Sequence, residues 1–145
     1  MATIRVAALF FFALFVAQGS ARDSRDVAAK APMMFLESLK TFDNRLHTYI
    51  FSHHLKNWVT EEDVPGLLAL LDSKEPCAGV MYDASGSVPG RSTVGDQAAF
   101  LVEGFRTRLY PPSLYSKPLT DSQKADLRNW WRTYQAATAA PQRDS

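Results

Sequence analysis

The chain has 145 residues, with 16 Lys and Arg, 15 Asp and Glu, and a formal net charge of +1. A protein that binds nucleic acid through its phosphates shows a basic excess or a basic stripe, so this balance excludes nucleic acid from the expected partners. A single cysteine, Cys77, excludes an internal disulfide. The length suits one domain that is stabilised by packing alone.

The first residues have the pattern of a secretory signal peptide. Arg5 precedes the apolar run Val6–Ala17, and the small residues Gly19 and Ala21 stand at the two positions that a signal peptidase reads. The apolar run is shorter than the roughly 20 residues that a membrane-spanning helix needs. We therefore expect cleavage after Ala21, export to a periplasm or the extracellular space, no membrane attachment afterwards, and no net charge once Arg5 is removed.

One long central helix, Pro32–Trp58, is expected to organise a helical domain at residues 32–137, after a flexible arm at residues 22–31. Its apolar residues recur at steps of three or four, which places them on one helix face: Phe35, Leu39, Phe42, Leu46, Tyr49, Ile50 and His53. A strand at Thr48–Phe51 is the alternative, because all four residues favour a pleated surface. No strict alternation extends that run, so the helix is preferred.

Three shorter helices are expected after the central one, at Val64–Leu71, Lys74–Ala84 and Val94–Leu109. Each follows a residue that favours the helix N-cap: Thr60 or Asp63, Ser73, and Ser92 or Thr93. Consecutive short helices joined by turns resemble HEAT-type helical hairpins, although no internal repeat of a fixed period is present.

The clearest capping signature is Thr120 with Gln123 three residues later, which predicts a last helix that ends at about Ala137. Residues 138–145 are expected to be a disordered tail. The predicted fold class is therefore all-α, a single small domain of about five helices packed on the central one.

Asp43, His47 and His54 are candidate metal ligands, because imidazole and carboxylate groups on one helix face can bind zinc or copper. His54 is seven residues beyond His47, which is about 10 Å along a helix axis and too far for one ion. A surface pair of Asp43 with His47 is therefore the preferred interpretation. No metal and no other cofactor is expected.

Cys77 is the candidate catalytic nucleophile. It would lie near the N-terminus of an expected helix, which lowers the pKa of a thiol, and His47 or His54 could be brought close to it by folding. The apolar neighbours Pro76 and Ala78 favour a small buried thiol instead. An enzyme is therefore the less favoured class.

The segment Gly86–Thr93 is similar to a phosphate-binding loop, but it has three residues between its glycines where that loop has four, and Arg91 in place of Lys. The Gly90-Arg91-Ser92-Thr93 helix start could still hold a small anion or a carboxylate with its free N–H groups and the guanidinium. The alternative is a turn with a Ser or Thr cap.

Aromatic residues exceed what a small core needs, and adjacent residues on a helix point about 100° apart, so Trp130 and Trp131 cannot both face inward. One of them could instead cover the joint between the last helix and the central one. Exposed Trp and Tyr are preferred anchors of protein interfaces. We therefore expect an exported protein-binding module, of adaptor, inhibitor or immunity type, that docks a protein partner through Tyr110, Tyr115, Trp130 and Trp131. The alternatives are an anion or small-ligand carrier that uses Arg91, and an enzyme that uses Cys77 or a His47/His54 metal site.

Overall fold

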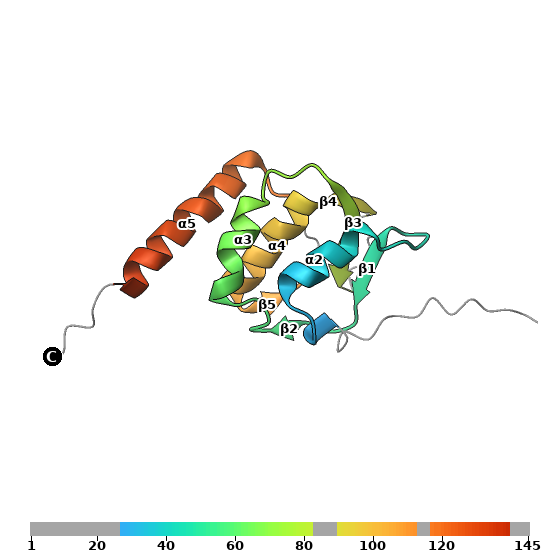
Figure 1. Ribbon diagram of the computed structural model, residues 1–145, viewed down its shortest axis with the longest axis horizontal. Helices are drawn as coiled ribbons and strands as arrows, with labels where there is room; N and C mark the ends of the chain where they lie inside the picture. Colours follow the sequence, from blue (N-terminus) through green and yellow to red (C-terminus); the bar gives the residue numbers. More distant parts are fainter. Residues whose placement is uncertain (1–26, 83–89, 113–116, 140–145) are drawn as a thin grey trace, which may run out of the picture.

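The computed structural model describes residues 27–82, 90–112 and 117–139, and this part of the chain contains both helices and strands (Figure 1). The prediction of an all-α fold is therefore wrong. The predicted signal peptide, Tyr115 and the end of the predicted tail lie outside the described residues. The elements in chain order are α2 (Pro32–Lys40), β1 (Thr48–Phe51), β2 (Leu55–Lys56), η1 (Glu61–Asp63), α3 (Val64–Ala69), β3 (Pro76–Tyr82), β4 (Arg91–Thr93), α4 (Val94–Thr107), β5 (Leu109–Tyr110) and α5 (Asp121–Ala139).

The long central helix is not formed. Helix α2 begins at Pro32, as its missing N–H allows, and ends at Lys40. Beyond it the Asn44 side chain accepts a hydrogen bond from the Thr48 N–H at 3.1 Å and donates to the Thr48 carbonyl at 2.9 Å. Such local hydrogen bonds compete with the helix, and the strand that was the alternative, Thr48–Phe51, follows at once.

The helix predicted at Lys74–Ala84 is a strand instead. Strand β3 is the centre of a three-stranded sheet, parallel to β1 and antiparallel to β4. Its residues Cys77–Met81 are all buried, so the strand has no alternation of apolar and polar residues. A short apolar run of this kind cannot be distinguished from a buried helix by periodicity. Because the middle segment is a strand, no HEAT-type arrangement forms.

A second, two-stranded sheet pairs β2 with β5, with Leu55 opposite Tyr110. The Tyr110 ring lies inside a group of aromatic rings, with centroid distances of 5.2 Å to Trp58, 5.5 Å to Phe51 and 6.2 Å to Phe35. Val27, from the segment predicted to be a flexible arm, is also buried in this core. Pairs of rings at such distances add to the energy of burial, so the aromatics are used mainly inside the fold.

The helices predicted at Val64–Leu71 and Val94–Leu109 are confirmed as α3 and α4 with ends displaced by about two residues, and the last helix continues to Ala139. The predicted caps are also present. Thr60 and Asp63 form a capping box before α3, and the Thr120 N–H donates to the Gln123 side chain at 2.9 Å. The residues of a capping box lie within four positions of one another, so the sequence predicts these caps without knowledge of the tertiary structure.

Helix α5 lies on the side of the molecule away from the three-stranded sheet (Figure 1). Lys124 of α5 forms an ion pair of 3.0 Å with Asp96 of α4, and the two side chains are only 4% and 14% exposed. Arg128 contacts Asp72 at 2.7 Å, but the Asp72 side chain is largely exposed. The first pair is therefore a buried connection between α5 and α4, and the second a surface one.

Replacing Lys124 with Ala should lower the free energy of unfolding by about 3 kcal/mol, because the Asp96 carboxylate then stays buried without its cation. Arg128→Ala is the matched control and should cost less than about 1 kcal/mol, since its partner is in water. Urea denaturation followed by circular dichroism measures both values. Equal losses for the two variants would contradict the buried connection.

Gly95→Ala should also destabilise the protein, by about 2 to 3 kcal/mol. A Cβ atom at this position would clash with the backbone carbonyl of Leu71 and lie 2.7 Å from that of Ser73. Gly66→Ala is the control, because its Cβ would meet only the Met33 sulfur at 3.8 Å and a helical alanine is favoured over glycine. Urea denaturation should show no loss for Gly66→Ala, and a tolerated Gly95→Ala would contradict the close approach.

Candidate functional site

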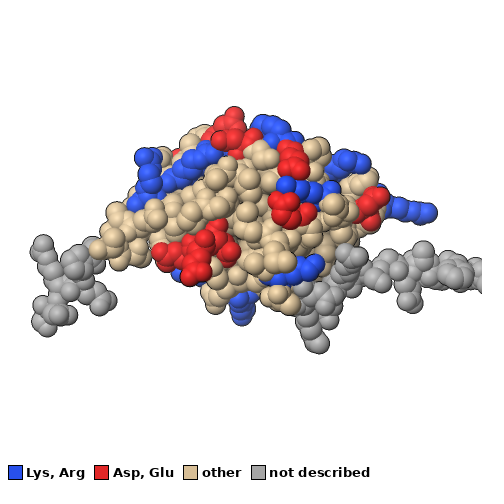
Figure 2. All heavy atoms as spheres, in the orientation of Figure 1, with Lys and Arg blue, Asp and Glu red and all other residues tan. Residues whose placement is uncertain are grey.

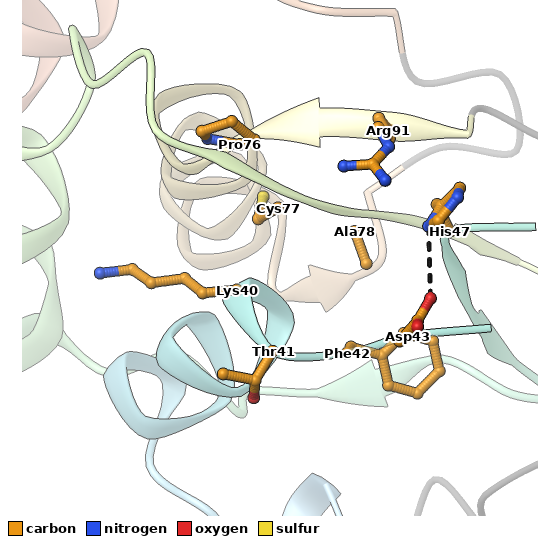
Figure 3. A pocket seen from close by; sticks show the side chains of 9 residues that line it. All are labelled: Lys40, Thr41, Phe42, Asp43, His47, Pro76, Cys77, Ala78 and Arg91. Carbon is orange, nitrogen blue, oxygen red and sulfur yellow. Dashed lines mark ion pairs between the residues drawn. The ribbon is translucent and has the colours of Figure 1, made fainter.

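A hollow of about 240 Å³ opens between the end of α2, the start of β1 and one end of the β3–β4 pair (Figure 3). Four of the predicted site residues line it together: Asp43 and His47 (candidate metal ligands), Cys77 (candidate nucleophile) and Arg91 (candidate anion site). The other lining residues were not predicted to belong to a site: Lys40, Thr41, Phe42, Pro76 and Ala78. The structure thus brings four of the nine predicted site residues to one place.

The hollow results from the size of the residues that lie side by side in the sheet. Arg91 of β4 is paired with Ala78 of β3. On the other side of β3 the His47 carbonyl accepts a hydrogen bond from the Gly79 N–H at 2.9 Å, as part of the pairing of Thr48 with Gly79. Arg91 and His47 therefore lie on either side of Ala78, whose side chain is a single methyl group (Figure 3). An alanine between two longer side chains leaves an open space above it.

A tight turn positions His47 at the edge of this space. Its backbone has a φ of 46°, in the left-handed region, and its N–H donates to the Asn44 carbonyl at 3.0 Å. The His47 Nδ1 lies 3.7 Å from the Asp43 Oδ1, so the predicted Asp43–His47 surface pair is present although the segment is not helical. The two atoms are too far apart for a hydrogen bond.

The basic side chains of the hollow differ in whether carboxylates of the protein already form ion pairs with them. Lys40 contacts Glu37 at 2.8 Å and Glu75 at 3.0 Å, and these two hydrogen-bonded carboxylates raise its pKa. Its Nζ points away from the other charged groups (Figure 3). In the described residues no carboxylate forms an ion pair with the exposed Arg91 guanidinium. Among the described residues, Arg91 is therefore a basic group of the hollow without an acidic partner.

The first backbone amides of α4, which the sequence offered as a possible anion site, have partners within the protein. The Val94 N–H donates to the Glu75 carbonyl at 2.9 Å and the Gly95 N–H to the Ser73 carbonyl at 3.1 Å. The Asp96 N–H donates to the Thr93 hydroxyl at 3.2 Å. Protein groups thus satisfy the amides that an anion would need. Arg91 contributes from strand β4 and not from a helix start.

Cys77 does not have the environment of a nucleophile. It lies in a strand, where no helix N-terminus lowers the pKa of its thiol, and the side chain is 5% exposed. Burial, followed by the nearby charges of Asp96 and Glu75, raises the pKa to about 12. The thiol is therefore protonated at neutral pH, and the proposed catalytic role loses its physical basis.

His54 is separate from the hollow. Its ring is stacked on Tyr82 with a centroid distance of 4.2 Å and an interplanar angle of 7°. Tyr82 ends β3, whereas Cys77 is near the start of the same strand. The predicted metal ligands thus divide between two places, with Asp43 and His47 at one of them. Within the described ranges, no group of three or more His, Cys, Asp or Glu could hold a metal ion.

The aromatic residues predicted to bind a partner are largely used inside the protein. Tyr110 is buried in the core, where burial raises its pKa, and Trp131 is buried as well. Trp130 is half-buried and, with Trp131 and Tyr134, packs around the Phe105 ring at centroid distances of 5.7 to 6.1 Å. The two tryptophans therefore cover the joint between α5 and α4. Tyr115 lies outside the described residues.

Two larger hollows are weaker candidates for a functional site. One, of about 690 Å³, lies between α4 and the start of α5, and its lining includes Pro112 and Lys117, which flank a segment outside the described residues. The other, of about 410 Å³, is lined by Val27, where the described chain begins, and by Phe35. Neither has a boundary that the described residues define completely, and neither gathers the predicted site residues.

Charged side chains of both signs are interspersed on the face of the molecule shown in Figure 2, and no continuous basic stripe crosses that face. This distribution matches the near-neutral composition of the chain. Among the described residues, none of the helices combines the length and the apolar character needed to cross a membrane.

The Cys77 thiol should resist modification in the folded protein. With a pKa of about 12, only about one thiol in ten thousand is ionised at pH 8. Ellman's reagent should therefore react with the native protein far more slowly than with the protein in 6 M guanidinium chloride, where the thiol is in water. A native rate equal to the denatured rate would show that Cys77 is accessible and activated.

Comparison with known proteins finds no match for this chain. No family model, no curated protein and no solved structure matches the chain. What the protein does must therefore be inferred from the hollow above Ala78 and from the charges around it.

Proposed function

We propose that the protein binds a small ligand with a carboxylate or phosphate group in the hollow above Ala78. The observation that carries this proposal is the Arg91 guanidinium, which lines the hollow beside His47 and has no acidic partner among the described residues. A guanidinium group presents planar pairs of N–H donors that match the two oxygens of such groups.

The walls of the hollow are mainly polar, which suits a small polar ligand. Phe42, Pro76 and Ala78 contribute a smaller apolar part, and the Thr41 side chain also lines the hollow (Figure 3). The volume of about 240 Å³ is below the 300–1,000 Å³ typical of sites for drug-sized ligands. A metabolite of a few carbon atoms fits this space better than a nucleotide or a lipid.

The affinity should be modest. Arg91 is exposed, so water competes for its donors and salt screens its charge. One charge-assisted contact of about 2 to 3 kcal/mol and a few apolar contacts correspond to a dissociation constant of about 1 mM. Such an affinity suits a carrier or a sensor of an abundant metabolite.

The other two functions have less support. Of the aromatic residues on which the protein-binding hypothesis depends, Tyr110 and Trp131 are buried. The enzyme hypothesis needs either a thiolate at Cys77 or a set of metal ligands. The raised pKa of Cys77 and the separate positions of His47 and His54 disfavour both.

Arg91→Gln should abolish binding of acetate, propionate and phosphate, because the amide keeps hydrogen-bonding capacity but removes the charge. Two-dimensional NMR titration at constant ionic strength measures this, with shifts expected at the amides of Ala78 and Gly79. Arg132→Gln on the exposed surface of α5 is the matched control and should bind like the unchanged protein. Identical titrations of Arg91→Gln and the control would refute the proposed site.

A further inference from the structure

The hollow carries charges of opposite sign on its two sides. The Arg91 guanidinium extends from β4, and the Asp43 carboxylate extends from the connection between α2 and β1, with His47 beside both (Figure 3). Arg91 belongs to β4, one neighbour of β3, and Asp43 precedes β1, the other neighbour. A ligand that fills the space therefore meets a cation at one end and an anion at the other.

The Asp43 carboxylate keeps its capacity to accept hydrogen bonds. Its side chain is 88% exposed, and its ion pair with the His47 Nδ1, at 3.7 Å, is longer than a hydrogen bond. No other ion pair of Asp43 occurs within the described part of the chain. A protonated amine at this side of the hollow could donate to it directly.

A purely anionic ligand is not the best match for this arrangement. Arg91 would attract its negative charge, but Asp43 would repel it. Glu37 and Glu75, which form the ion pairs with Lys40, would repel it at the other end of the hollow. An ammonium group on the same ligand turns the repulsion at Asp43 into attraction. Asp43 is largely in water, where the attraction between unit charges about 3 to 4 Å apart raises an affinity by about five- to tenfold.

We infer that the ligand of this hollow is a small zwitterion of the amino-acid type, with its carboxylate at Arg91 and its protonated amine at Asp43. The inference rests on the proposed anion site and adds the second charge. The Ala78 methyl group, which also lines the hollow, can contact the carbon atoms of the ligand. A phosphate dianion, which has no amine and a larger negative charge, is the poorer ligand.

Titration with three matched small molecules tests the inference. Alanine carries both charges, propionate only the carboxylate and ethylamine only the amine. At constant ionic strength and pH 7, NMR titration of the whole protein should show alanine binding five- to tenfold more tightly than propionate, and ethylamine binding most weakly. Including 4-aminobutyrate, whose charges are farther apart, reports the spacing that the hollow accepts.

Two variants separate this inference from the anion site. Asp43→Asn should abolish the preference for alanine over propionate, and Arg91→Gln should abolish binding of both. Asp121→Asn, an exposed residue at the start of α5, is the matched control and should keep the preference. Equal affinities for alanine and propionate, or an unchanged preference in Asp43→Asn, would overturn the zwitterion while leaving the anion site in place. If neither compound bound the unchanged protein, both proposals would fail.

Discussion

Strand β3 is hydrogen-bonded on both of its edges, to β1 and to β4, and this double pairing determines where the helices can pack. Its residues are buried on both faces, and α2 and α4 both lie against it. The same pairing aligns Arg91 with Ala78 and places the turn residue His47 on the other side of β3. The hollow therefore depends on register, because a shift of one residue between β3 and β4 would turn the Arg91 side chain to the other face of the sheet.

The parts of the fold that could be predicted are those whose signals are local. Caps such as Thr93 for α4 and Thr120 for α5 act on amides within one turn, so they can be read directly. The strands depend on partners far away in the sequence. Strand β1 has a sequence that fits a helix by period and a strand by composition, and only β3 decides between them. Because Cys77–Met81 of β3 are all buried, the sequence lacks the alternation of apolar and polar residues that identifies a strand.

In the candidate site too, the sequence shows which side chains can take part in chemistry but not which of them lie together. Arg91, Asp43 and His47 were recognisable from their side chains, but Arg91 was assigned to an anion site and Asp43 with His47 to a metal site or a surface pair. The meeting of these residues depends on long-range pairing of the strands, which local sequence does not show. Ala78, whose small size creates the space, gave no signal, since an alanine in an apolar run is ordinary. The environment of Cys77 differs from the predicted one. The thiol was expected at a helix N-terminus, which lowers its pKa, but it lies in a buried strand.

The Asp96 carboxylate interacts with the starts of both α4 and α5. It accepts a hydrogen bond from the Thr93 hydroxyl at 2.8 Å at the start of α4, and its other carboxylate oxygen binds Lys124 of α5. Local opening of α5 would remove the Lys124 cation from that carboxylate, which also binds the Thr93 cap, and would therefore weaken the first turn of α4 as well. The two helix starts should therefore open together, as one cooperative unit in native-state hydrogen exchange. The end of α5 beyond Tyr134, which is exposed throughout, is free to fray independently of that unit.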